Sequence, residues 1–169
     1  MANTVSEVLT AVLANTGYNV PAGAAGVREK VIQGVITVAA LLDNDIIGLA
    51  WLPANVQITE FRAGGDVNVD CNLGLYRTDR ASATADPTLI TSSEDVLVDG
   101  LTLNTTSIAT HAEWTGTNAA ARGSNLWEAA GLTTQDPDNP TYEVALTVED
   151  AAVADGTGTI EFILKYVDH

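Results

Sequence analysis

Apolar and polar residues alternate along much of the chain after residue 26, which is the pattern of β-strands with one buried face. The clearest case is DVNVDCNLGLY (66–76), where every second residue is apolar. YEVALTV (142–148) and TIEFILKYV (159–167) have the same period, and we expect them to pair with each other as antiparallel strands. In 66–76 the expected core residues are Val67, Val69, Cys71, Leu73 and Leu75, with Asp66, Asn68, Asp70 and Asn72 as a polar row on the opposite face.

Three further segments upstream also favour strands. VIQGVITVAALL (31–42) is β-branched and apolar on both faces, which predicts a well-covered strand. DIIGLAWL (45–52) follows, and NVQITEFR (55–62) alternates but changes phase near its end, which predicts a β-bulge. The pair Gly64-Gly65 then predicts a turn. At least six strands with no regular helix between them indicate an all-β sandwich or barrel.

The first 26 residues follow a different pattern. Apolar residues in 4–14 recur at helical spacing, and Gly17 stands where a helix is expected to end. An irregular link, NVPAGAAG (19–26), follows this short amphipathic helix. We therefore divide the chain into an N-terminal helix and arm (1–26) and a β-sandwich domain (27–169). The helix either packs on its own domain or reaches a neighbouring subunit, through Val5, Val8, Leu9, Val12 and Leu13.

Composition and charge limit the possible partners. Hydrophobic residues make up 46% of the 169 positions and charged ones 17%, so the chain is expected to fold around a core. The net charge is −15, from 22 acidic against 7 scattered basic residues. Nucleic-acid binding requires a basic stripe, and anionic lipids repel an acidic surface, so we expect neither nucleic acid nor membrane as a partner. The N-terminus has no cationic start or clear cleavage site, so no signal peptide is expected.

The segment 66–76 also resembles the start of a calcium loop, because Asp66, Asn68 and Asp70 stand at alternate positions. That loop requires Gly at its sixth position and Glu at its twelfth, where this chain has Cys71 and Arg77. Alternate residues of an extended strand also lie too far apart to bind one ion. We therefore interpret the segment as a strand, with Cys71 as a small buried hydrophobe.

No other motif predicts catalysis. Asp136 and Asp138 lie in DPDNP, where a weak cation site and an ordinary turn are both open, the turn being the more common use of such residues. His111 lies two residues before Glu113, without a marked nucleophile beside it. GTGTIE (156–161) lacks the third Gly of a nucleotide fingerprint and opens a strand. We predict no catalytic residue, no metal site and no cofactor, and hence a protein that is not an enzyme.

A set of short motifs resembles small virion proteins of tailed phages. In the first half these are Leu-Pro-Ala (52–54) after an apolar strand, and Leu-Gly-Leu (73–75) after an acidic turn. In the second half they are LWEAAGL (126–132), the Tyr-initiated YEVALTVEDAA (142–152) and the final GTIEFILKYV (158–167). The motifs resemble those of head decoration, or capsid cement, proteins.

The resemblance covers residues 27–167 and implies a jelly-roll-like antiparallel β-sandwich. A protein of this kind would be made in the host cytoplasm and would lie on the outer capsid surface of the virion. It would bind the major capsid protein between capsomers as a homo-oligomer, with a trimer favoured. No catalytic residue comes with the resemblance. Ile163 and Val167, on the outward phase of the last strand, are candidates for a subunit contact.

Three alternatives remain open from the sequence. One is another structural protein of the virion, from the neck, tail or fibre. Another is a small hydrolase on a β-sandwich, which would need convergent acidic residues or His111 in a pocket. The last is a β module that binds carbohydrate or a host surface, which a local cluster of exposed aromatic residues would favour. Aromatic residues make up only 5% of this chain, and its three tryptophans are spread apart.

Overall fold

The computed structural model describes residues 29–78, 95–103, 123–135, 141–151 and 157–168. The predicted N-terminal helix, with its five apolar residues, lies outside these ranges. His111, Glu113, Asp136 and Asp138 lie outside them as well. Those predictions therefore remain predictions.

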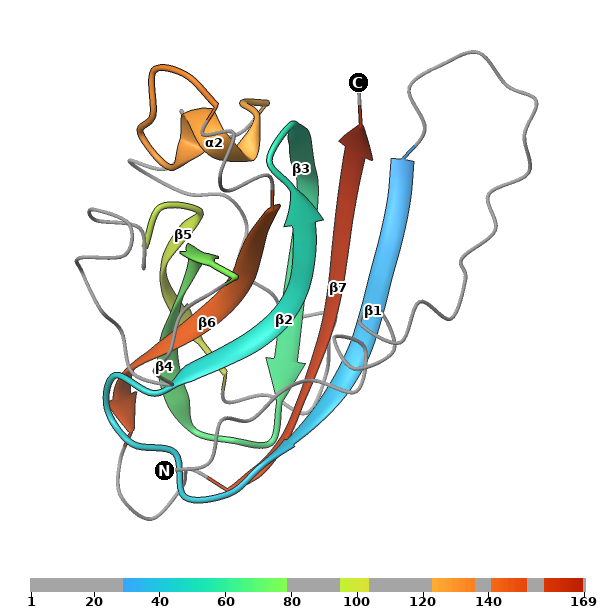
Figure 1. The fold of residues 1–169 in the computed structure, drawn as a ribbon. Helices are drawn as coiled ribbons and strands as arrows, with labels where there is room; N and C mark the ends of the chain where they lie inside the picture. Colours follow the sequence, from blue (N-terminus) through green and yellow to red (C-terminus); the bar gives the residue numbers. More distant parts are fainter. Residues whose placement is uncertain (1–28, 79–94, 104–122, 136–140, 152–156, 169) are drawn as a thin grey trace.

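The described residues form a β-sandwich of two antiparallel sheets with one short helix (Figure 1). The three-stranded sheet has the order β1-β7-β3, and the four-stranded sheet has the order β2-β6-β4-β5. One hydrophobic core, with residues from both sheets, lies between them. This confirms the all-β sandwich class. The strands are β1 (Glu29–Val38), β2 (Ile46–Pro53), β3 (Val56–Gly65), β4 (Val69–Arg77), β5 (Val98–Thr102), β6 (Thr141–Ala151) and β7 (Gly158–Asp168).

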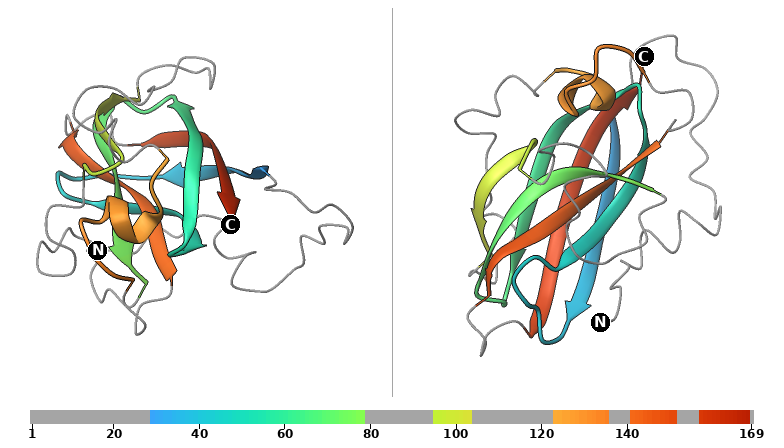
Figure 2. Two further views of the ribbon diagram at one scale, coloured as in Figure 1. Left: turned by 90° about the horizontal axis from the view of Figure 1, so that it is seen from above. Right: turned by 60° about the vertical axis from the view of Figure 1, so that its left-hand side comes forward.

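The two C-terminal strands do not pair with each other, so that expectation was wrong. β6 pairs with β2 and β4, whereas β7 pairs with β1 and β3 (Figure 2). Each strand lies inside its own sheet and needs a neighbour on both sides. Alternation reports which side chains face the core, and it does not report which strand lies alongside. The inner faces were predicted correctly: Tyr142, Val144, Leu146, Val148, Ile160, Phe162 and Leu164 are all buried.

The first strand is an edge strand and is not covered on both faces. β1 ends at Val38, and the apolar run continues through Ala40, whose φ of 55° is left-handed, into a loop. Ile36 is buried, but Val31 and Val35 are 42% and 49% exposed. One side of β1 is apolar because it faces the core. The other side also carries valines, and these lie on the surface.

β3 confirms the predicted bulge and corrects the predicted turn. Its register against β7 shifts between Ile58 and Glu60, where the hydrophobic phase changes. Gly64 and Gly65 do not form a turn; they are the last two residues of the strand. A Cβ atom at Gly65 would lie 2.5 Å from the backbone oxygen of Thr159, so the close approach of β7 requires glycine there.

The strand predicted at 66–76 is β4, which begins later, at Val69, and the apolar side of the whole segment is in the core, as predicted. Val67, Val69, Cys71, Leu73 and Leu75 are all buried. Burial raises the pKa of the Cys71 thiol to about 12, so this side chain behaves as a hydrophobe. The polar row on the opposite face is only partly on the surface: Asn68 is exposed, but Asn72 is 2% exposed. That part of the prediction was wrong, because the outer side of the four-stranded sheet is also buried at this point.

The helix α2 (Leu126–Ala129) closes one end of the sandwich near β3 (Figure 1). The backbone N–H of Asn125 donates to the Glu128 carboxylate at 2.8 Å, which caps the helix start. The N–H of Trp127 donates to the Ala54 carbonyl at 3.2 Å, which ties the helix to the turn between β2 and β3. Leu126 is buried in the core.

Candidate interaction surface

The outward side of the three-stranded sheet combines exposed apolar side chains with paired charges. Regular pairing of β1 with β7, and of β3 with β7 beyond its bulge, brings outward side chains of three strands into rows. We call this surface the outer face. Its side chains are Glu29, Val31, Gln33, Val35 and Thr37 of β1, Gln57, Thr59, Glu60 and Arg62 of β3, and Thr159, Glu161, Ile163, Lys165 and Val167 of β7.

Both candidate contact residues of the last strand lie on the outer face. Ile163 stands between Gln33 of β1 and Arg62 of β3, and Val167 stands at the end of the same strand. Both side chains are partly buried by their neighbours. The strand phase therefore placed them on the correct side of the sheet, while their contact with another subunit stays a prediction.

Sequence reasoning missed Val31 and Val35, which are the most exposed large apolar residues of the outer face. They lie opposite Lys165 and Glu161 of β7. The signal was present in the sequence, since both share one phase of β1 with Glu29 and Gln33. It was hidden because the other phase of the strand is apolar too.

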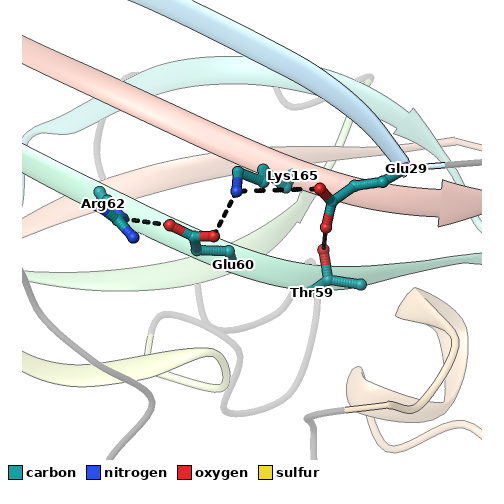
Figure 3. Close-up of polar contacts among 5 residues, drawn as sticks. All are labelled: Glu29, Thr59, Glu60, Arg62 and Lys165. Atoms are coloured by element: carbon teal, nitrogen blue, oxygen red, sulfur yellow. Dashed lines mark hydrogen bonds and ion pairs between the residues drawn. The ribbon is translucent and has the colours of Figure 1, made fainter.

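A network of charged groups fixes the β3 side of the outer face (Figure 3). The Lys165 ammonium lies 2.6 Å from Glu60 Oε2 and 3.9 Å from Glu29 Oε2. Arg62 pairs with the same Glu60 carboxylate, and the Thr59 hydroxyl donates to Glu29 at 2.9 Å. Two cations thus share one carboxylate, and three strands are joined side chain to side chain.

The network shifts the ionisation of its members. The hydrogen bond from Lys165 is the main cause that lowers the pKa of Glu60, with Arg62 adding to it. The same contact raises the pKa of Lys165. The pairing therefore favours the charged form of both groups.

No three His, Cys, Asp or Glu side chains within the described ranges gather where they could hold a metal ion. Over the same residues, no helix is long and apolar enough to cross a membrane.

The described residues form an all-β sandwich, and comparison with solved structures finds chains of similar structure. A chain of the capsid of Ralstonia phage GP4 is similar with a TM-score of 0.63 and 20% identity, over 98% of this chain and 97% of that one. A chain of the cyanophage Pam1 capsid asymmetric unit has a TM-score of 0.49 and 16% identity, over 92% and 96%. No protein-family model and no curated protein matches the sequence. At this level of identity the first likeness shows a shared fold alone.

Proposed function

We propose that the chain is a structural virion protein that decorates and cements the outer surface of a bacteriophage capsid. It binds the major capsid protein between capsomers as a homo-oligomer, and it carries out no catalysis. The observation that carries the proposal is the fold shared, over 97% or more of both chains, with a chain of the capsid of Ralstonia phage GP4. The protein would be made in the host cytoplasm and located on the outer capsid surface.

The strand order supports a jelly roll as the finer description of the fold. β1 and β3 belong to one sheet, and β2 and β4 belong to the other, so the chain crosses between sheets at each step. The last two strands then return, β6 inside the four-stranded sheet and β7 inside the three-stranded one. Strands that wind between two sheets in this way are typical of the jelly rolls found in viral capsid proteins.

The surface also suits a protein that binds other proteins. The net charge of −15 disfavours contact with packaged DNA. The outer face offers Val31 and Val35 beside charges already held by intramolecular pairs. A partner that covers this face would bury apolar surface without leaving Lys165 or Glu60 unpaired.

Co-sedimentation with capsids assembled from the cognate major capsid protein tests the proposal directly. We expect the purified chain to pellet with capsids that lack it and to saturate at a fixed ratio. Ile163→Glu on the outer face should weaken this binding, whereas Leu132→Glu, an exposed position after α2, should not. Failure of the unmodified chain to bind the capsid lattice contradicts the proposal, and binding to purified tails instead would support a neck, tail or fibre role.

A second experiment concerns the N-terminal arm. The amphipathic pattern of residues 4–14 predicts an apolar contact, within the domain or with a neighbour. Deletion of residues 1–26 should reduce the mass of the oligomer if the helix reaches a neighbour. An unchanged oligomer by light scattering would remove the arm from assembly.

A further inference from the structure

The described sheets have four edge strands, and three of them carry features that discourage pairing with another chain. β2 contains a register shift and ends at Pro53, β3 contains a bulge, and β5 is 5 residues long with Gly100 at a φ of 75°. Bulges, prolines and short strands are the usual protection of sheet edges. β1 has none of them: it runs for 10 residues in unbroken register with β7.

The backbone groups of β1 on the open side can be assigned from its partner strand. Thr159 of β7 directs its carbonyl to the Asp66 N–H and its own N–H to the Asp66 carboxylate, on the β3 side. Successive residues of a strand point their backbone groups to opposite sides, so Ile160 directs its groups to Ile36 of β1. Gln33, an odd number of residues from Ile36, then directs its N–H and C=O away from β7.

The same phase of β1 carries its exposed apolar side chains. Val31 and Val35 are 42% and 49% exposed, and they flank Gln33 symmetrically. Among the described residues β1 pairs with β7 alone. An edge of this length, regular and apolar on its outward side, is a template for another strand.

We propose that this edge binds a second copy of the chain, β1 against β1 in antiparallel register, with a twofold axis at Gln33. Val31 of each copy then lies opposite Val35 of the other, and Gln33 lies opposite itself. The two three-stranded sheets become one continuous six-stranded sheet. This pairing rests on the homo-oligomer of the proposed function and names its contact, and its twofold symmetry gives a dimer in place of the trimer that the resemblance favours.

Charge favours this edge over the rest of the surface. Two molecules of net charge −15 repel each other, so self-association is least opposed where no acidic group lies in the contact. Residues 31–38, VIQGVITV, contain no charged side chain. In the proposed register Glu29 lies opposite Thr37 of the other copy, so the two Glu29 carboxylates stay at opposite ends of the contact.

Oligomeric mass tests the contact, and it does so without capsids. We expect the full chain to form a dimer by sedimentation equilibrium, with a dissociation constant raised about tenfold or more by Val35→Lys, which puts a solvated charge at the contact. Leu42→Lys is the matched control, because Leu42 is 48% exposed in the loop after β1 and should leave the dimer unchanged. Circular dichroism of both variants checks that the sandwich is intact.

Cross-linking tests the register. In a hydrogen-bonded antiparallel pair opposite Cα atoms lie about 5.5 Å apart, within the range of a disulfide. Gln33→Cys should therefore form a covalent dimer under mild oxidation, while Thr37→Cys, about 27 Å from its own copy at about 3.4 Å per residue, should not. The native Cys71 is buried and does not compete.

Each outcome decides the proposal. A dimer that Val35→Lys dissociates and Gln33→Cys cross-links supports it. A monomer, or a dimer or trimer whose mass Val35→Lys leaves unchanged, overturns it. Equal cross-linking by Gln33→Cys and Thr37→Cys overturns the register. Capsid binding is a separate measurement, so a failed β1 contact and a failed cement function are distinguishable.

Discussion

The outward sides of the two sheets differ in their exposure to solvent. The outer face of the three-stranded sheet is open, with Val35 at 49% exposure and its charges paired at the surface. On the four-stranded sheet the corresponding side is closed: Asn72, Glu143 and Thr147 are 2%, 4% and 2% exposed. Both sides carry polar residues at alternate positions, so polarity alone does not show which side of a strand meets solvent.

Three buried polar side chains of the closed side, Asn72, Tyr76 and Thr147, have hydrogen-bond partners. The Tyr76 and Thr147 hydroxyls are bonded to each other, and the Gly100 N–H donates to Asn72 Oδ1 at 2.8 Å. Ile46, Tyr76 and Ala145 form a small apolar cluster beside them. Burial of polar groups is tolerated where such bonds replace those to water.

The strongest test of this contrast puts a charge on each sheet. Ala145→Asp places a carboxyl at a position that is 0% exposed, and we expect a loss of about 4 kcal/mol or more, enough to unfold a marginal domain. Val35→Asp, on the open outer face, should change the free energy of unfolding of the monomer by about 0.5 kcal/mol or less, measured at a protein concentration below the dissociation constant of the β1 contact. Urea unfolding measures both, and similar losses would mean that the outer face is buried too.

A second test compares two asparagines of one strand region. Asn72→Ala removes a buried side chain and its bond from Gly100, so we expect a loss of about 2 kcal/mol. Asn68→Ala changes an exposed side chain and should cost about 0.5 kcal/mol or less. Thermal unfolding resolves the difference. Equal costs would place Asn72 on a solvated surface, against the burial described above.

The third test isolates one hydroxyl of the closed side. Tyr76→Phe keeps the ring in its cluster with Ile46 and Ala145 but leaves the Thr147 hydroxyl without this partner. We expect a loss of about 1 kcal/mol in chemical denaturation. In a Thr147→Val background the same Tyr76→Phe change should cost less, and an undiminished cost would show that the two hydroxyls are not coupled.

The smallest effect is expected from the charges of the open side. Glu60 is paired with Lys165 and Arg62 at the surface, so Glu60→Gln should cost at most about 1 kcal/mol at neutral pH. Because folding lowers the Glu60 pKa below its ordinary 4.5, this stabilisation is present above that value and is lost as the pH falls through the folded-state pKa.

The free energies of unfolding of wild type and Glu60→Gln should therefore converge in acid. Urea titrations at pH 7 and at pH 2 to 3 provide the measurement, with Glu161→Gln, an exposed carboxylate on the same outer face, as the control. A difference that persists at the lower pH would mean that Glu60 acts through packing and not through its charge.

Local pattern predicted the inner faces of the strands and little of what lies beyond them. The apolar residues of 66–76 are in the core, and the change of phase before Phe61 marks a true bulge, because both follow from neighbours along the chain. Strand partners depend on contacts between distant residues, so the placement of β6 and β7 in different sheets left no local signal.

The sequence predicted only part of the outer face, because the phase of a strand can be read locally and its place in a sheet cannot. Ile163 and Val167 follow from the outward phase of a strand whose other phase is clearly apolar. Val31 and Val35 lie in a run that is apolar on both phases, which is also the pattern of a fully buried strand. Only the position of β1 at an edge separates the two cases. The predicted helix contacts of the first 26 residues stay predictions.

The central places of β6 and β7 have a consequence for how the protein is made. Lys30 and Asp168 are bonded although 138 positions separate them, and each sheet receives an interior strand from residues 141–168. While the ribosome is still translating earlier residues, β1 and β3 have no strand between them, and neither have β2 and β4. Closure of both sheets therefore waits for the end of this region to emerge, and a nascent chain stopped before it exposes both halves of an unfinished core.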